Sequence, residues 1–184
     1  MKVIFLDIDG VLNSARSFIA NHPRGLPTWK TMDERNIATI DPIAVKLVNE
    51  LAHRLEAEIV VSSSHRKWFY MRSFSYEIGP TLDKPALIAY MQGFGIEKEI
   101  IDATPVLSGE GRIRGDEIAL WLSKNPGVEK YVILDDDGDM LPIQKEKHFV
   151  QTDNYNGFMF EDYQKAELIL GQNETTNIFV PSRC

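Results

Sequence analysis

Short apolar runs separated by longer amphipathic segments occupy most of the chain. The three clearest runs are mostly apolar and cover residues 3–6, 58–61 and 131–134. Runs of this kind are typical of strands that are buried on both faces of a parallel sheet. Weaker strand patterns cover residues 96–103 and 148–152. The chain is therefore expected to contain a sheet of parallel strands.

Segments with apolar residues at helical spacing lie between these strands. They cover residues 41–55, 83–92, 115–124 and 163–170. The first has the clearest start, because Asp41 is a favourable N-cap and Pro42 suits the first helical position. Strands that alternate with helices predict an α/β fold, and we expect a Rossmann-like three-layer sandwich with a central parallel sheet.

The chain length of 184 residues suits one well-buried domain, so residues 1–184 are expected to form a single domain. Residues 14–40 are irregular and contain Pro23, Gly25 and Pro27, which break helices and strands. Because connections of this length are usually functional, we interpret the segment as a lid or flap inserted after the first strand. We do not expect a large additional domain, or cap, over the edge of the sheet, so the predicted cap is small or missing.

Composition restricts the class of protein. No apolar run approaches the length of a membrane span, and the N-terminal run ends at Asp7, so neither a membrane span nor a signal peptide is expected. The only cysteine is Cys184, which argues against an internal disulfide framework and a cysteine zinc site and favours the cytoplasm. The net charge of −7 argues against a general nucleic-acid coat but leaves room for a local basic surface.

Polar and acidic residues follow the three clearest strands. Asp7 and Asp9 follow the first, residues 62–64 are three serines after the second, and residues 135–139 contain four aspartates after the third. A buried carboxylate is costly unless it is paired or bound to a cation. Parallel strands bring their C-terminal ends to one edge of the sheet, where open α/β sheets bind ligands. We therefore expect these residues to share one site suited to phosphate and metal chemistry.

Three of these segments resemble motifs of a known superfamily. Residues 7–12 (Asp-Ile-Asp-Gly-Val-Leu) resemble the first motif of the haloacid dehalogenase (HAD) superfamily, whose members are mostly magnesium-dependent phosphohydrolases. Residues 60–63 and 133–139 are similar to its second and fourth motifs. Three motifs in order, each after its own strand, are a specific signal. Residues 60–66 and 114–118, with the acidic strand end, also resemble small HAD domains of RNA-repair proteins.

The resemblance implies roles for the residues that match its motifs. Asp7 would be the nucleophile and would form an aspartyl-phosphate that water then hydrolyses. Asp9 would protonate the leaving oxygen and later activate water, with a pKa expected to be raised by neighbouring carboxylates. Ser62 or Ser63 would hydrogen-bond a phosphate oxygen, although either serine could simply belong to a polar loop. Gly10 would let the backbone turn sharply beside the substrate.

Magnesium is the cofactor that the resemblance implies, and Mg²⁺ prefers oxygen ligands in octahedral geometry. Asp7, the backbone carbonyl of Asp9 and an aspartate of the later cluster would bind it. Asp136 or Asp135 is favoured as that aspartate, with Asp139 behind it in the outer shell.

The third motif of the superfamily departs from its usual pattern in this chain. It is usually a lysine at the start of the helix before the fourth-motif strand, whereas the nearest cation here is Arg114. An arginine can bind phosphate through two hydrogen bonds, so the role can survive the exchange. Lys84 and Lys98 are alternatives, and Arg114 as an ordinary solvated residue is another.

Two segments next to the expected site carry basic residues and no acidic ones. They are residues 14–32, with Arg16, Arg24 and Lys30, and residues 65–76, with Arg66, Lys67, Arg72 and five aromatic residues. In an acidic protein this pattern indicates a mouth for an anionic, base-bearing substrate, with Arg66 and Lys67 as candidate substrate-binding residues. The alternative is a core-facing aromatic helix with ordinary surface cations.

The predicted function is Mg²⁺-dependent phosphomonoester hydrolysis through an aspartyl-phosphate. The substrate would be a phosphorylated small molecule or a phosphorylated nucleic-acid end, and no protein partner is predicted. Alternatives are phosphate transfer to another acceptor and a non-catalytic phosphate- or metal-binding module. Because the chain retains both Asp7 and Asp9, the enzyme is favoured over the binding module.

Overall fold

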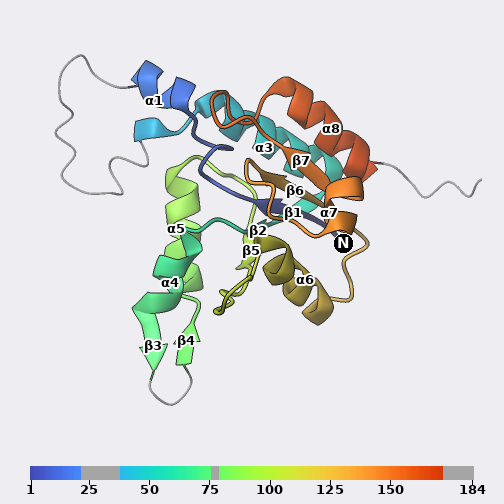
Figure 1. The fold of residues 1–184 in the computed structure, drawn as a ribbon. Helices are drawn as coiled ribbons and strands as arrows, with labels where there is room; N and C mark the ends of the chain where they lie inside the picture. The colour runs from blue at the N-terminus through green and yellow to red at the C-terminus, as the bar shows by residue number, and fades with distance from the viewer. Residues whose placement is uncertain (22–37, 76–78, 172–184) are drawn as a thin grey trace, which may run out of the picture.

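The computed structural model describes residues 1–21, 38–75 and 79–171. In this part of the chain, a five-stranded sheet with the order β5-β2-β1-β6-β7 forms the centre (Figure 1). Every neighbouring pair of strands is parallel. The strands are β1 (Lys2–Leu6), β2 (Ala57–Val61), β5 (Ile100–Ala103), β6 (Lys130–Asp135) and β7 (Phe149–Gln151). The predicted strands are confirmed, although β5 and β7 are shorter than expected.

Helices cover both faces of the sheet. α3 (Pro42–Leu55) and α8 (Phe160–Gly171) pack against one face, and α6 (Arg114–Lys124) covers the other (Figure 1). α5 (Lys84–Gly93) contacts β5. The four predicted helices are therefore confirmed to within a few residues at their ends, and so is the three-layer α/β sandwich.

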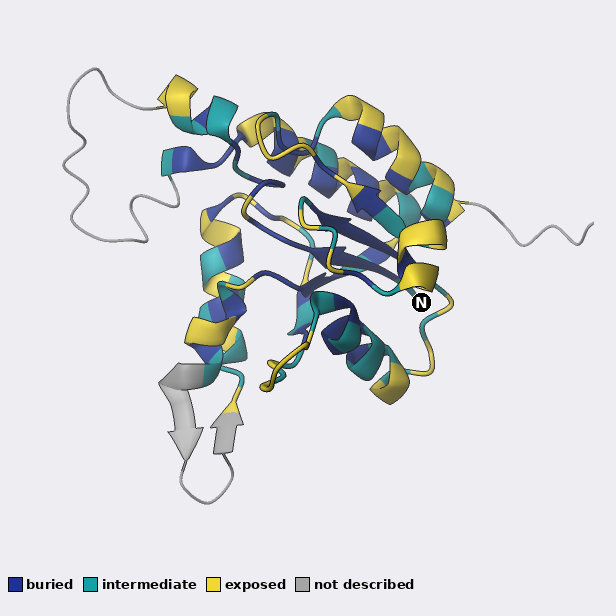
Figure 2. Ribbon diagram, in the orientation of Figure 1, coloured by how far each residue is buried: buried dark blue, intermediate teal, exposed yellow. Residues whose placement is uncertain are grey.

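Alternate residues of the central strands enter different cores. In β1, Ile4 and Leu6 belong to the larger core, which α3, α5 and α8 complete. Phe5 belongs to the smaller core, together with Ile118 and Trp121 of α6. Figure 2 shows the strands buried and the exposed residues mainly on the outer sides of the helices. Burying one large apolar side chain contributes about 1.5–3 kcal/mol, so burial on both faces explains why these strands are almost wholly apolar in sequence.

Several short elements lie where the sequence predicted neither helix nor strand. They are α1 (Ala15–Asn21), the antiparallel pair β3 (Ser73–Ser75) and β4 (Gly79–Thr81), and α7 (Pro142–Lys147). α4 (Arg66–Arg72) agrees with the alternative interpretation of residues 65–76 as a helix. Residues 22–37 of the predicted lid lie outside the described residues. Among the described helices, none is both long enough and apolar enough to cross a membrane.

Candidate active site

The C-terminal ends of four neighbouring strands form one row. Leu6 of β1 pairs with Val61 of β2 and with Leu134 of β6, and Val61 pairs with Ala103 of β5. The residues that come next therefore lie side by side in the order Thr104, Ser62, Asp7, Asp135. Backbone hydrogen bonds of 2.9 to 3.0 Å continue the ladder through this row. Because side chains alternate along a strand, this row faces α6, as Phe5 does one pleat earlier.

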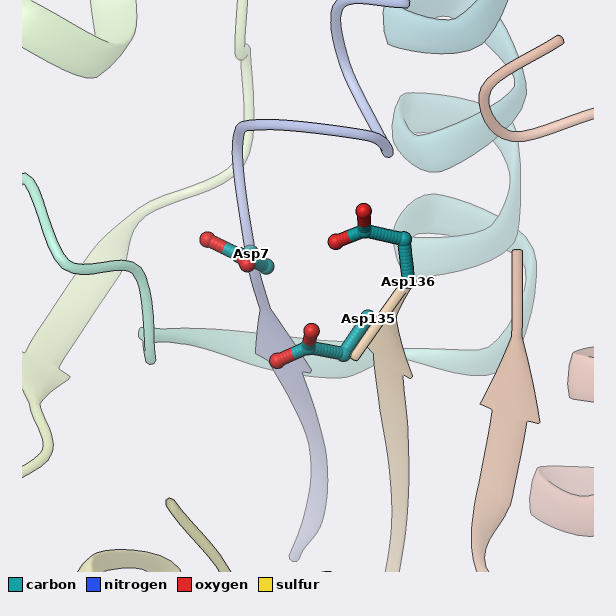
Figure 3. Close-up of side chains that lie close together, drawn as sticks. All are labelled: Asp7, Asp135 and Asp136. Atoms are coloured by element: carbon teal, nitrogen blue, oxygen red, sulfur yellow. The ribbon is translucent and has the colours of Figure 1, made fainter. Parts of the chain in front are cut away.

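Three aspartates form a cluster at this edge. Asp7 follows β1, and Asp135 and Asp136 lie at the end of β6, so that the three side chains lie close together (Figure 3). One oxygen of each lies within 4.8 Å of the others. Asp7 and Asp135 are buried, and Asp136 is half-buried. Burial and the neighbouring Asp7 raise the pKa of Asp135 to about 8, and the same two causes raise the pKa of Asp136. The cluster therefore favours either a bound proton or a cation.

These donors fit a hard divalent cation such as Mg²⁺. All three offer carboxylate oxygens, and Oδ2 of the buried Asp135 accepts no hydrogen bond from the described residues, although Nε of Arg114 lies 3.2 Å away. A buried acceptor without a hydrogen bond is uncommon and costly, and a dication would compensate it. The side chain of Asp9 lies outside this cluster, so only its backbone carbonyl stays a candidate ligand, as the sequence analysis proposed.

Arg114 places a positive charge beside the cluster. It is the first residue of α6, and its side chain is 12% exposed. Nη1 lies 3.3 Å from Oδ2 of Asp7 and donates to the Ser62 carbonyl, while Nε lies 3.2 Å from Oδ2 of Asp135. Burial lowers the pKa of Arg114, but the nearby carboxylates outweigh this effect and raise it. The exposed Asp139 positions the helix start by accepting a hydrogen bond from the Arg114 backbone N–H at 3.1 Å.

The other candidate cations take no part in this arrangement. Lys98 pairs with Glu58, near the start of β2, at 3.6 Å. Lys84 begins α5, and none of the ion pairs between described residues joins it to the three aspartates. Arg114 is thus the one of the three candidates that reaches the cluster.

Gly10 makes close packing at the cluster possible. Its φ is +71°, and a Cβ built on it would lie 2.3 Å from Cγ of Asp136. Only glycine adopts this conformation readily, and any side chain here would displace Asp136. The Gly10 carbonyl accepts a hydrogen bond from Thr152 Oγ1 at 2.8 Å, which fixes the turn to the strand end of β7.

The two candidate serines differ in their surroundings. Both are fully buried. Oγ of Ser63 accepts a hydrogen bond from the His65 backbone N–H at 3.3 Å, whereas Oγ of Ser62 has no partner among the described residues. Ser62 also belongs to the row of strand ends that contains Asp7. Oγ1 of Thr104, at the end of this row, is likewise buried and has no partner in the described part of the chain. Thr104 was not predicted as a site residue, because the pattern of its strand is weak.

Asp9 points toward the loop after β2. Its side chain is 59% exposed, and each carboxylate oxygen has a partner: Nδ2 of Asn13 at 2.8 Å and Nε2 of His65 at 3.0 Å. The hydrogen bond from His65 is the main reason that the pKa of Asp9 is lowered. The expectation that neighbouring carboxylates raise this pKa is therefore wrong. This contact between His65 and Asp9 was not predicted, because the two residues are far apart in the chain.

Comparison with known families gives one match. Residues 3–163 match the family described as the HAD domain in Swiss Army Knife RNA repair proteins. The chain belongs to this family. The matched range contains four of the five strands completely, all of β1 except its first residue, and every residue of the site described above. The comparison found no match among curated proteins or solved structures. Membership confirms the resemblance stated from the motifs and supports a phosphatase-type hydrolase.

Arg66 of this HAD domain is an internal residue, so its prediction as an open-mouth residue is wrong. Its side chain is 1% exposed. Its guanidinium forms an ion pair with Glu117 of α6 and donates to four backbone carbonyls, those of Ser62, Ser63, Thr104 and Pro105. Because these carbonyls follow β2 and β5, Arg66 holds the two strand ends together. Its donors are used inside the protein and are not available to a substrate.

The rest of the predicted basic mouth is only partly described. On α4 of the HAD domain, Lys67 and Trp68 are exposed and Phe69 is buried. Arg16 pairs with Asp41 at 2.8 Å and is half-exposed. The positions of Arg24, Lys30 and Tyr76, and the side chains of Arg72 and Phe74, lie outside the described residues. The described part of α4 thus buries one aromatic residue, as the alternative interpretation expected, and exposes one cation and another aromatic residue.

Proposed function

We propose that this HAD domain is a Mg²⁺-dependent phosphomonoester hydrolase that acts through an aspartyl-phosphate on Asp7. The observation that carries the proposal is the convergence of Asp7, Asp135, Asp136 and Arg114 at the C-terminal edge of the sheet. A buried group of carboxylates with one arginine fits the binding of a metal ion together with a phosphate dianion, because the cation offsets the carboxylates and, with the arginine, attracts the dianion.

Asp7 is the proposed nucleophile. Oδ1 accepts a hydrogen bond from the Ile8 backbone N–H at 2.7 Å, which holds the carboxylate in a fixed orientation, while Oδ2 faces Arg114. In the first step a carboxylate oxygen attacks phosphorus, and the bond to the ester oxygen breaks as that oxygen receives a proton from Asp9. In the second step water attacks the phosphoryl group and gives its proton to Asp9. Inorganic phosphate leaves and free Asp7 is restored.

Asp9 is proposed to serve both steps despite its lowered pKa. The ionised form suits the second step, in which Asp9 accepts a proton from water. For the first step Asp9 must carry a proton, and a phosphate dianion bound beside it would raise its pKa, because a like charge disfavours ionisation.

Asp7, Asp135 and the backbone carbonyl of Asp9 are proposed to hold Mg²⁺, with Asp136 as a further acidic ligand. When bound, the ion supplies positive charge that draws the phosphate toward the nucleophile and offsets the negative charge of the transferring group.

Arg114 and Ser62 are proposed to hold the phosphoryl oxygens. Arg114 can exchange its contacts with Asp7 and Asp135 for contacts with phosphate, which a guanidinium binds through two hydrogen bonds. Ser62 is favoured over Ser63, because its Oγ lies in the row of Asp7 and has no partner within the described structure. The hydroxyl hydrogen of Ser62 is therefore free to be donated to a phosphate oxygen.

The substrate is proposed to be a phosphorylated RNA end. The family description supports this class, and Trp68 supplies a physical reason. The Trp68 backbone N–H donates to the His65 carbonyl at 3.2 Å, and residues three apart in such a turn lie on the same side. Trp68 is 57% exposed, so it offers a stacking surface about one turn from the residue that contacts Asp9. The exposed Lys67 adds positive charge to the same helix.

The test is phosphate release from three substrates: 4-nitrophenyl phosphate and one RNA oligonucleotide with either a 3′- or a 5′-phosphate. Each is assayed with Mg²⁺ and with EDTA. We expect metal-dependent release that Asp7→Asn abolishes, whereas the matched variant Asp137→Asn, at an exposed residue outside the cluster, retains it. Release that persists in Asp7→Asn would refute the nucleophile. A phosphoenzyme that forms but transfers its phosphate only to an added alcohol would favour the phosphotransferase.

A further inference from the structure

The Asp9 side chain is held more firmly than its exposure suggests. An aspartate that is 59% exposed can ordinarily sample several rotamers, because water satisfies each of them. Here two donors from different parts of the chain hold its two oxygens. Asn13 belongs to the loop after β1, and His65 immediately precedes α4.

Both donors are themselves held in place. Oδ1 of Asn13 accepts a hydrogen bond from the Gly10 backbone N–H at 3.1 Å. Nδ1 of His65 lies 2.7 Å from the hydroxyl of Tyr90, which belongs to α5. The Tyr90 ring packs against Phe69 and Phe94, with ring centroids 5.4 and 4.5 Å away. The chain of contacts therefore runs from the aromatic packing around α5 to the carboxylate of Asp9.

The chemistry of the groups sets the direction of these hydrogen bonds. An ionised carboxylate can only accept, so Nε2 of His65 must carry the hydrogen that Asp9 receives. In the neutral ring, Nδ1 then accepts the hydroxyl hydrogen of Tyr90. Tyr90 thus selects the tautomer and the orientation in which His65 donates to Asp9.

We propose that His65, oriented by Tyr90, is a positioning residue that holds the Asp9 carboxylate where it exchanges a proton with the leaving oxygen. This inference rests on the proposed function. Proton transfer requires heavy atoms within hydrogen-bond distance, and a displacement of about 1 Å can reduce a rate by about 100-fold. The carboxylate keeps further lone pairs beyond the two that Asn13 and His65 occupy, so it can still contact the substrate.

This role makes the effect of His65 depend on the leaving group. A nitrophenolate leaves readily without a proton, whereas an alkoxide needs one. Loss of positioning should therefore slow formation of the phosphoenzyme for alkyl esters and spare it for activated aryl esters. General damage to the site would slow both to a similar extent.

The experiment measures kcat/KM, which reports the steps up to phosphoenzyme formation, for three substrates of similar shape: 4-nitrophenyl, phenyl and benzyl phosphate. For His65→Ala we expect a loss of about tenfold or more with benzyl phosphate and of less than about threefold with 4-nitrophenyl phosphate. His65→Gln should recover much of the loss, because its amide can donate to Asp9 and accept from Tyr90. Tyr90→Phe should give the same pattern with a smaller loss.

The matched control is His53→Ala, because His53 lies on α3 and pairs with Glu97 at 3.4 Å, away from the row of strand ends. It should leave all three values unchanged. Equal losses of His65→Ala on all three esters, or failure of His65→Gln to recover activity, would overturn the positioning role and leave the proposed function intact. A wild-type protein that hydrolyses none of the esters and no phosphorylated RNA would overturn the proposed function and this inference with it.

Discussion

The substitution Arg66→Ala is expected to destabilise the protein strongly, because Arg66 is an internal anchor. Its side chain is 1% exposed, and it donates to four backbone carbonyls and to Glu117. Alanine would remove one buried donor from each of these acceptors and would leave the Glu117 carboxylate, 12% exposed, without its cation. Buried acceptors without partners are costly, and an unpaired buried charge is more costly still.

The expected size follows from this burial. Removing one partner of a buried ion pair costs about 3–5 kcal/mol, a large part of a native stability of about 5–15 kcal/mol. With a urea m-value of about 2 kcal/mol/M, the unfolding midpoint should fall by about 2 M. Glu117→Ala should cause a similar loss, because Oε1 of Glu117 also accepts the Leu107 backbone N–H at 3.0 Å. The double variant should lose less than the sum of the two, because each single change already breaks the shared pair.

Urea unfolding followed by circular dichroism measures these losses. The matched control is Arg54→Ala, because Arg54 pairs with Glu167 at 3.1 Å on the solvent-exposed surface, and its midpoint should be unchanged. An Arg66→Ala protein with wild-type stability and a raised KM for RNA substrates would refute this reasoning. It would mean that the Arg66 side chain reaches the substrate.

Four further predictions concern the site and its surroundings. Burial and Asp7 raise the pKa of Asp135 to about 8 from its ordinary 3.8. The stability of the metal-free protein, measured as its urea unfolding midpoint, should therefore fall as pH rises between these two values, and Asp135→Asn should remove this fall. Mg²⁺ affinity, measured by calorimetry, should rise over the same range, since binding displaces the proton, and a flat profile would contradict the raised pKa. Gly10→Ala should weaken Mg²⁺ binding about tenfold or more, because its Cβ would collide with Asp136; unchanged affinity would argue against the packing described. Trp68→Ala should lower kcat/KM about tenfold for phosphorylated RNA and leave 4-nitrophenyl phosphate unaffected, while Phe160→Ala, which removes an equally exposed aromatic ring on α8, should change neither.

The sequence could predict the sheet and the main acidic residues because both depend on local patterns. Strands buried on both faces are continuous apolar runs, and parallel strands must end at a common edge. Such runs are directly followed by Asp7, Ser62 and Asp135, so the fold class alone predicts that these three residues lie side by side. The short elements were missed because a helix of six residues, such as α7, or a strand of three, such as β3, is too short for a periodic pattern.

The partners of Asp9 and Arg66 could not be predicted, because they come from distant parts of the chain. The pKa of Asp9 depends on His65, 56 positions later, and a sequence shows the neighbouring aspartates but not this contact. Arg66 follows three serines and a histidine and precedes a lysine, which is the pattern of an exposed basic segment. The acceptors of the Arg66 side chain are mostly backbone carbonyls. Every residue has a backbone carbonyl, whatever its side chain, so no residue type in the sequence indicates which ones Arg66 will contact.

The carboxylates at this edge of the sheet are separated by their surroundings into two kinds. Asp135 is buried beside Asp7, which raises its pKa, so it gains most from a cation. Asp9 is exposed and accepts a hydrogen bond from His65, which lowers its pKa, so it is ionised when no substrate is present. Environments that push the pKa values of neighbouring acids apart commonly divide acid–base work between them. Under the proposed function, the buried acids would hold the metal and Asp9 would handle the proton. The division depends on His65 and on the burial of Asp135 more than on the acids themselves, and both can be changed without altering Asp7.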